Sequence, residues 1–160
     1  MSESEVVRRV ILLPIDGSEH SERAFRWYLD NLKSSSDILK FINIVEPVYS
    51  TPAVGLAMDT PPLTDIAEMM QDSIDKGKLL SKKYIEEAKK FDVNCEGILY
   101  VDTQPGTILL KSIENHNANL IIMGNRGLGV LRRTFLGSVS DYILHHAHIP
   151  VVIVPPKVKH

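Results

Sequence analysis

The sequence lacks most of the features that would set it apart from ordinary globular proteins. It contains a single cysteine, Cys95, which excludes a disulfide within the chain and fits a reducing compartment. No apolar run is long enough to cross a bilayer, and the N-terminal Met-Ser-Glu-Ser-Glu is too polar for a signal or transit peptide. The net charge of −2 lacks the basic excess of a general nucleic-acid binder. We therefore expect one domain over residues 1–160, cytoplasmic, with neither membrane nor nucleic acid as a partner.

The chain does contain a regular alternation of apolar runs and helical patterns. Nearly continuous apolar runs indicate strands whose two faces are both covered in a parallel sheet. Such runs lie at Val10–Ile15, Ile38–Val45, Val93–Val101, Leu120–Met123 and Val151–Val154. The segments between them carry apolar residues at helical spacing. This alternation predicts an α/β fold, a doubly wound open parallel sheet of five strands with helices on both faces.

Several residues mark where the predicted helices begin. Ser18 stands where its hydroxyl would cap the first helix, and a long helix is predicted from about Leu63 to Phe91. Pro105 fits the first turn of the third helix. The fourth helix opens with Ser138-x-x-Asp141, a variant of the capping box.

The proline-rich stretch from Glu46 to Pro62 interrupts this rhythm directly after the second predicted strand. The carboxyl ends of strands form the ligand side of an open α/β sheet, so the stretch is interpreted as a flap over a ligand. A solvated insertion without a role is the alternative interpretation.

Four small residues follow the fourth predicted strand: Gly124, Gly127, Gly137 and Ser138. Glycines let a phosphate approach main-chain N–H groups, and the first turn of the helix that follows favours negative charge. A Walker loop would need a lysine after its glycine, and a dinucleotide fingerprint would follow the first strand. The residues alone favour a phosphate site, with an ordinary turn and helix cap as the alternative.

Asp16 ends the first predicted strand and places a carboxylate at the same edge of the sheet. There it would accept a hydrogen bond from a base or sugar, or help to hold a cation between phosphates. A role in the local turn is the alternative, because aspartate suits turns and helix starts.

Asp16 after the first strand, together with Gly-x2-Gly-x9-Gly-Ser after the fourth, resembles the universal stress protein family in its ATP-binding branch. The resemblance extends from Arg9 to Pro155, and the motif matches at every fixed position. It implies a Rossmann-like sheet in the order 3-2-1-4-5, of the adenine nucleotide alpha hydrolase-like type. Members of this branch carry the glycine motif and bind ATP, whereas members of the other branch lack it.

The resemblance also implies which residues would contact ATP. The adenine and ribose would lie near Pro14, Asp16 and Val45, with Met123 bordering the pocket. The phosphates would lie against Gly124, Arg126, Gly127, Gly137, Ser138, Val139 and Ser140. Mg²⁺ would accompany the triphosphate, and the planar guanidinium of Arg126 would meet phosphate oxygens as a fork.

The implied function is that of an ATP-binding regulatory module in stress response. No Ser/His/Asp or Cys/His arrangement stands out, so we expect slow ATP hydrolysis at most and assign no catalytic residue. A weak Mg-dependent ATPase and a nucleotide-free dimeric interaction module remain as alternatives.

Other charged residues near the motif receive simpler interpretations. Arg132 and Arg133 are interpreted as part of a solvated face. His145, His146 and His148 are interpreted as complements to the negative end of a helix rather than as metal ligands.

A homodimer is expected through the last predicted strand. Val151–Val154 has no polar side chain, and the order 3-2-1-4-5 puts it at the edge of the sheet. An uncovered apolar edge invites pairing with another strand, and pairing with a second copy about a two-fold axis would close the assembly. Pro150 and Pro155 would limit the pairing, since proline donates no ladder hydrogen bond.

Overall fold

The computed structural model describes residues 7–48, 62–125 and 136–157. The strands are β1 (Arg9–Ile15), β2 (Asp37–Val45), β3 (Asn94–Val101), β4 (Leu120–Gly124) and β5 (Val151–Val154). The helices are α1 (Glu19–Asn31), α2 (Leu63–Lys89), α3 (Pro105–Asn115) and α4 (Ser138–His146). The predicted strands and helices are confirmed, with ends displaced by one or two residues.

The strands form one parallel sheet in the order β3-β2-β1-β4-β5. This confirms the expected fold class and strand order. The central strand β1 pairs with β2 on one side and with β4 on the other, and β3 and β5 form the two edges.

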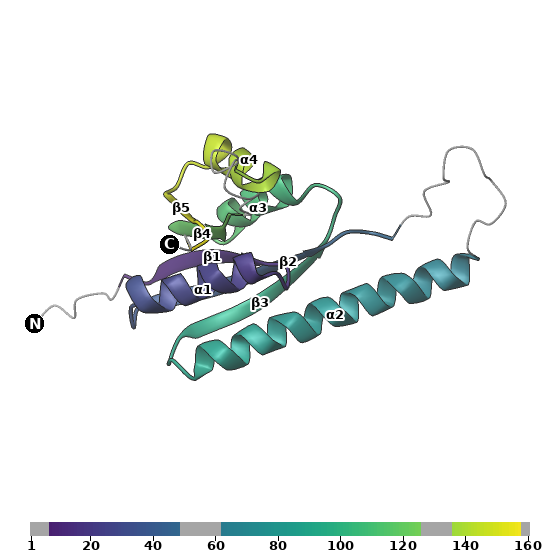
Figure 1. Cartoon of the computed structure of the whole chain (residues 1–160), viewed down its shortest axis with the longest axis horizontal. Coiled ribbons are helices and arrows are strands. Elements are labelled where there is room, and N and C mark those ends of the chain that lie inside the picture. Colours follow the sequence, from purple (N-terminus) through teal and green to yellow (C-terminus); the bar gives the residue numbers. More distant parts are fainter. Residues whose placement is uncertain (1–6, 49–61, 126–135, 158–160) are drawn as a thin grey trace, which may run out of the picture.

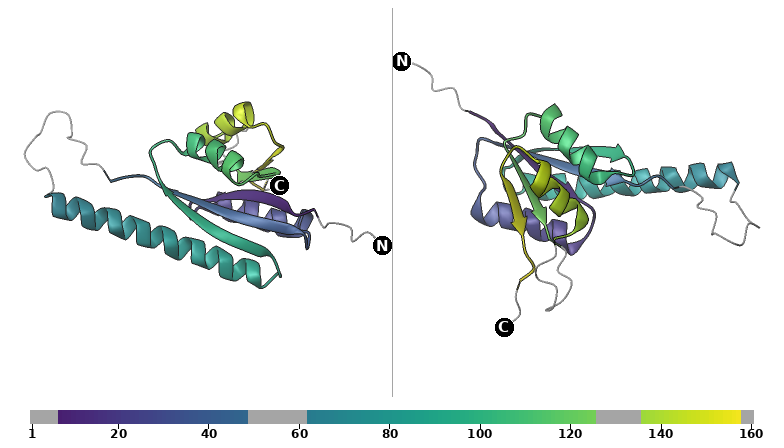
Figure 2. Two further views of the ribbon diagram at one scale, coloured as in Figure 1. Left: turned by 180° about the vertical axis from the view of Figure 1, so that it is seen from behind. Right: turned by 90° about the horizontal axis from the view of Figure 1, so that it is seen from above.

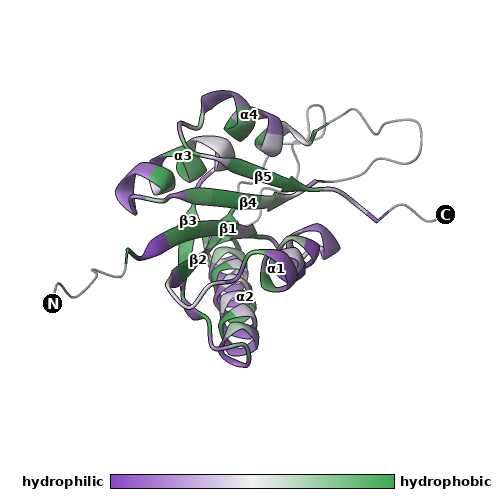
Figure 3. Ribbon diagram, turned by 90° about the vertical axis from the view of Figure 1, so that its left-hand side faces the viewer, coloured by the Kyte–Doolittle hydropathy of each residue, from purple (hydrophilic) through white to green (hydrophobic). Residues whose placement is uncertain are grey.

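Helices cover both faces of the sheet. Figure 1 shows α1 and α2 on one side and α3 and α4 on the other, and the views of Figure 2 agree. On the first side Phe25 meets Phe41 edge to face at 5.2 Å between ring centroids, and Tyr84 packs against both rings. On the second side Leu109 and Ile143 pack with residues of β1, β2 and β4 in a separate apolar cluster. The strands are apolar along most of their length (Figure 3), as expected between two helical layers.

Two helix starts differ in how they are capped. Ser18 caps α1 as predicted, since its hydroxyl accepts a hydrogen bond from the N–H of Ser21 at 3.4 Å. The predicted capping box of α4 is wrong, because Gly137 is the N-cap and no side chain caps the helix. Asp141 instead donates its backbone N–H to the carbonyl of Gly137 at 2.9 Å, and its carboxylate lies 3.4 Å from the ring of His145.

The long helix α2 packs on the sheet only through its second half. Its buried residues are Gly77, Ser81, Tyr84 and Ala88. At Gly77 a Cβ would lie 2.6 Å from Cδ1 of Leu99 and 3.0 Å from Nδ2 of Asn43, so the helix lies close to the sheet here and a larger residue would require these side chains to move. The first half of α2 runs out beyond the end of the sheet (Figure 1).

A buried carboxylate joins the start of β2 to β1 and α1. Asp37 accepts hydrogen bonds from the Arg9 guanidinium at 2.8 and 2.9 Å and from the Tyr28 hydroxyl at 2.9 Å. The backbone N–H of Ser34 donates to the same carboxylate at 2.9 Å. Asp37 is 1% exposed, and these partners satisfy a charge that would otherwise be costly to bury.

The single cysteine and the absence of long apolar runs were both noted in the sequence. Cys95 is half-buried in β3, and burial raises the pKa of its thiol, in keeping with a structural role. Within the described ranges, no helix combines the length and the apolar composition needed to span a bilayer.

Candidate functional site

A cleft of about 580 Å³ opens at the carboxyl ends of β1 and β4. These strands are neighbours in the sheet, and the chain continues from β1 toward β2 and β3 but from β4 toward β5. The connections that follow them therefore leave to opposite faces of the sheet. Open α/β sheets bind their ligands at such a switch in strand order.

Most of the described residues predicted to contact a ligand line this cleft. They share a position at the end of β1, at the end of β4 or in the first turn of α4, and are Pro14, Asp16, Met123, Gly124, Gly137, Ser138, Val139 and Ser140. The structure thus brings together short segments that lie far apart in the sequence, between positions 14 and 140.

Of the described residues that were predicted to contact the ligand, Val45 is not among those that line the cleft. Val45 points its side chain toward α2, where Cγ2 would lie 3.1 Å from a Cβ built on Gly77, and its neighbours Ile44 and Glu46 line the cleft instead. Arg126 and Gly127 lie outside the described residues, as do Arg132 and Arg133.

Gly137 leaves open space at the start of α4. Apart from its chain neighbours, no atom of residues 7–48, 62–125 and 136–157 would lie within 4 Å of a Cβ built on Gly137, and its φ of −61° is accessible to any residue. Backbone geometry therefore does not require glycine here. A ligand that fills this space would require it, because a side chain would occupy the same volume.

The first turn of α4 offers backbone donors beside this space. The first backbone hydrogen bond of the helix runs from Asp141 to Gly137, so the N–H groups of Ser138, Val139 and Ser140 have no carbonyl one turn earlier within the helix. These donors and the positive end of the helix dipole favour an anion.

Gly124 has a different role from Gly137. A Cβ at Gly124 would lie 2.0 Å from the carbonyl oxygen of His20, so no side chain fits between β4 and α1. Gly124 therefore allows the start of α1 to approach the end of β4, and this contact helps to form the wall of the cleft.

Asp16 takes part in the turn that leads into α1. Its carboxylate accepts hydrogen bonds from the backbone N–H of Ser18 at 3.0 Å and from the Ser18 hydroxyl at 2.5 Å. Gly17, between them, has a φ of +78°, a conformation that favours glycine. The alternative reading of Asp16 as a turn residue is thus supported, and its exposed carboxylate also faces the cleft.

Arg23 on α1 holds Asn125, the residue that follows the end of β4. Its guanidinium donates to the carbonyl of Asn125 at 2.7 Å and to that of Val154 at 3.3 Å. The N–H of Asn125 in turn donates to the carbonyl of Val154 at 3.0 Å. Burial lowers the pKa of Arg23, whose charge is held by carbonyl oxygens here.

The sequence analysis missed several residues of the cleft. Ser18, His20 and Ser21 come from the start of α1, and Pro105 and Leu109 come from α3. In a parallel sheet the helices that follow neighbouring strands begin at one edge, so the predicted helix starts were a usable signal.

The histidines of α4 are engaged within their own helix. The ring of His145 faces Asp141, and the ring of His146 stacks on Tyr142 at 4.3 Å between centroids. In residues 7–48, 62–125 and 136–157, no three His, Cys, Asp or Glu side chains gather as a metal site would require.

The doubly wound sheet and the cleft at its switch point define a Rossmann-like α/β protein with a candidate anion site. The model of the universal stress protein family matches residues 8–155. The chain therefore belongs to the universal stress protein family.

Relatives of known sequence agree with this assignment. The chain is 27% identical over 154 residues to a universal stress protein of Synechocystis, covering 90% of this chain and 96% of that one. It is also 27% identical over 150 residues to a universal stress protein of Mycolicibacterium smegmatis, covering 90% of this chain but only 47% of that longer protein.

Solved structures of the family share the fold. An Arabidopsis thaliana universal stress protein family member with AMP bound has a TM-score of 0.69 at 18% identity, covering 94% of this chain and 93% of that one. A universal stress protein in complex with cAMP has a TM-score of 0.65 at 20% identity, covering 91% of this chain and 96% of that one.

Proposed function

We propose that this chain is an ATP-binding universal stress protein, a cytoplasmic regulatory module that responds to stress by binding a nucleotide. The observation that carries the proposal is the space that the described residues leave at Gly137, in a cleft that Asp16 and the first turn of α4 also line. Relatives with AMP and with cAMP bound support an adenine nucleotide as the ligand.

The proposed placement follows the chemistry of the cleft walls. The triphosphate would lie at Gly124, Gly137 and the first turn of α4, where backbone donors favour negative charge. The ribose and adenine would lie toward Pro14 and Asp16, because Asp16 brings acceptor oxygens and the apolar side chains of Ile42, Ile44 and Met123 line the same cleft. Val45 would act there through its backbone, and Arg126 and Gly127 would complete the phosphate contacts.

Mg²⁺ would enter with the triphosphate rather than as a separately bound metal. Mg²⁺ prefers oxygen ligands and is often held by substrate phosphates and one or two carboxylates. Asp16 and Glu46 bring carboxylate oxygens to the cleft. The proposed role of the nucleotide is regulatory, and single-turnover assays with labelled ATP would detect any slow hydrolysis.

We also propose that residues 1–160 form one universal stress protein domain with a core of about 9–155, and that it forms a homodimer through β5. The residues of β5 are half-buried except for the last, and the strand ends the sheet without a covering strand in the order described. Pairing with a second copy would satisfy its outward backbone groups.

Gly137→Val tests the nucleotide proposal. Among the described residues no atom beyond the chain neighbours lies close to the added Cβ, so we expect the fold to tolerate the substitution, but the side chain would occupy the space proposed for phosphates. We expect isothermal titration to show ATP affinity reduced by about tenfold or more, which corresponds to ~1.4 kcal/mol. Adenosine lacks phosphates, so its affinity should change much less. An unchanged ATP dissociation constant in this variant would reject the site.

A further inference from the structure

The helix α2 carries a surface that the sheet does not use. Every buried residue of α2 lies at or after Gly77, and the preceding turns run beyond the sheet. Three large apolar side chains on the helix, Leu63, Met69 and Leu79, are 86%, 51% and 68% exposed. The sheet therefore leaves these side chains uncovered, and the spacing and charges of the residues around them indicate what they could contact.

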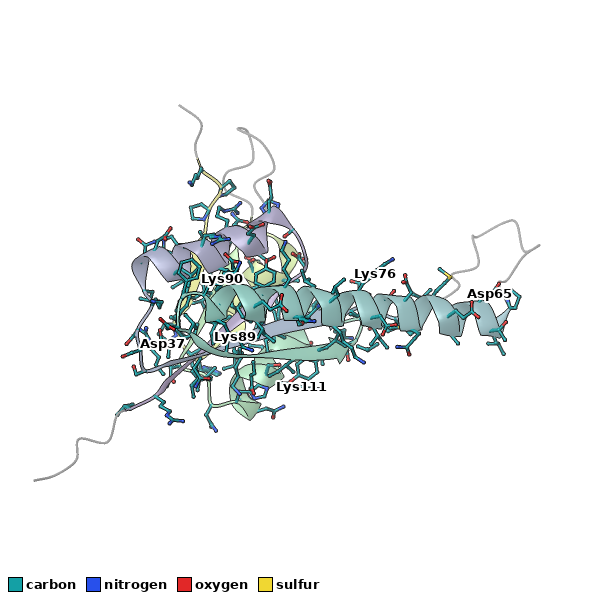
Figure 4. The ribbon with its side chains drawn as sticks, turned by 90° about the horizontal axis from the view of Figure 1, so that it is seen from below. Asp37, Asp65, Lys76, Lys89, Lys90 and Lys111 are labelled. Carbon is teal, nitrogen blue, oxygen red and sulfur yellow. The ribbon has the colours of Figure 1, made fainter. Side chains whose placement is uncertain are left out.

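Charges on α2 are separated along its length. Residues 63–75 contain four acids, Asp65, Glu68, Asp72 and Asp75, and no basic residue. Residues 76–90 contain six lysines and two glutamates. Figure 4 shows Asp65 near the far end of the helix, Lys76 along its middle, and Lys89 and Lys90 at the other end. One half is therefore acidic and the other basic.

Six of these residues lie along one line of the helix. Their numbers advance by alternating steps of four and three, the spacing that keeps side chains on one seam of paired helices. They are Asp65, Met69, Asp72, Lys76, Leu79 and Lys83. The last three also border a shallow groove of about 470 Å³ on the helix surface.

The seam is complementary in charge to the same seam of a second helix that runs in the opposite direction. A second copy of the helix running antiparallel, with its centre opposite Ile74, places Asp65 against Lys83, Met69 against Leu79, and Asp72 against Lys76. Each acid of the seam then meets a lysine, and the exposed Met69 meets the exposed Leu79. The same three pairs form twice, because a two-fold axis relates the copies.

We propose that α2 is a self-association surface. The α2 helices of two copies would pair antiparallel along the seam, and the two-fold axis would cross the seam between Asp72 and Lys76, level with Ile74. The occupant is a second copy of this chain, because the seam provides both halves of every contact. This contact is separate from the proposed dimer through β5, and neither depends on the other.

Asp65 and Lys83 give the sharpest test of the pairing. Within one helix they are 18 positions apart, or about 27 Å at 1.5 Å per residue, so they cannot touch in one chain. Asp72 and Lys76, in contrast, already form an ion pair within the helix at 2.6 Å. An effect that couples positions 65 and 83 must therefore pass between copies.

The experiment is sedimentation velocity on the full chain over the micromolar range in low salt. Asp65→Lys and Lys83→Asp should each weaken association by about tenfold or more, because each puts like charges opposite one another. The double variant D65K/K83D should restore the wild-type association constant. Lys78→Asp, the same charge change at an exposed position that is off the seam and not among the residues of the groove, is the matched control and should leave association unchanged.

Circular dichroism of each variant verifies that α2 is retained, and restoration by the double variant is itself evidence that the fold survives. To separate this contact from that of β5, the same series is repeated with Val152→Lys, and the pattern should persist. A wild type that gives no association sensitive to positions 65 and 83, or a double variant as weak as the single ones, would overturn the proposal.

Discussion

At the scale of single residues, the two described glycines of the motif have opposite requirements. Gly124 has no room for a side chain because the carbonyl of His20 occupies the position of a Cβ, whereas Gly137 faces open space. One glycine therefore serves the packing of the fold, and the other leaves a volume that a ligand can use. The sequence motif treats the two glycines alike, and only the structure separates these roles.

Stability measurements should separate these two glycines. Gly124→Ala should lower the free energy of unfolding by about 3 kcal/mol, because the obstructing atom belongs to the backbone and cannot rotate away. Gly137→Ala should change it by less than about 0.5 kcal/mol, as at most open surface positions. Urea denaturation of both variants provides the measurement. Equal destabilisation would show that Gly137 also serves packing.

Asp37 should make stability depend on pH. Burial acts to raise the pKa of Asp37, but the bonds from Arg9, Ser34 and Tyr28 outweigh it, and the net pKa is lowered. A lowered folded pKa means that this stabilisation is present above the ordinary aspartate pKa and is lost as pH falls through the folded value. Asp37→Asn should cost about 3 kcal/mol at pH 7, since it leaves Arg9 without its anionic partner.

Measurements at several pH values provide the control for Asp37→Asn. The difference in unfolding free energy between wild type and Asp37→Asn should shrink once the pH falls below the folded pKa, where the wild-type carboxyl is neutral. Urea denaturation at neutral and at strongly acidic pH gives both values. A difference that stays constant with pH would show that the charge of Asp37 is not what stabilises the fold.

At the scale of helices and strands, much of the fold could be predicted because each strand is a short apolar run. Val151–Val154 was predicted to the residue, and α2 was predicted to start at Leu63 and does. The end of α2 was placed two residues too late, since Phe91 follows the helix and Asp92 adopts a φ of +55°. The strand order came from the family resemblance, because apolar runs do not specify which strands pair.

The candidate site could be predicted only in part, for reasons that lie in side-chain direction. Successive side chains of a strand point to opposite faces, so a shift of one residue separates Val45 on the α2 side from Ile44 in the cleft. The helix α4 was expected to be capped by Ser138, yet backbone geometry made Gly137 the cap. His20 and Pro105 reach the cleft because α1 and α3 begin at the same edge of the sheet, which the predicted helix starts indicated but the glycine motif does not.

At the scale of the whole molecule, we propose that one mode of assembly uses the edge strand β5. In a chain that carries Asp65→Lys to weaken the proposed α2 contact, Val152→Lys should shift the proposed β5 dimer toward monomer, because it puts a charge into an apolar strand. Val152 also packs against the cluster beneath α1, so thermal melting must accompany the measurement. Sedimentation over the micromolar range provides the test.

Val7→Lys is the matched control for that substitution. Val7 is 82% exposed and precedes β1, so the same change there should leave the dimer intact. A wild type that remains monomeric over the same range would end the dimer proposal, and so would a dimer that Val152→Lys leaves unaffected.

The strand order has a further consequence for how the chain folds. Ile11 of β1 pairs with Leu120 of β4, so the contact that creates the switch point joins residues 109 positions apart. Contacts between distant residues carry a large loop-closure entropy and form slowly. During synthesis, β1, β2 and β3 can assemble with α1 and α2 while β4 is still inside the ribosome. The cleft cannot exist before β4 emerges, so it is absent from every nascent chain that ends before Leu120.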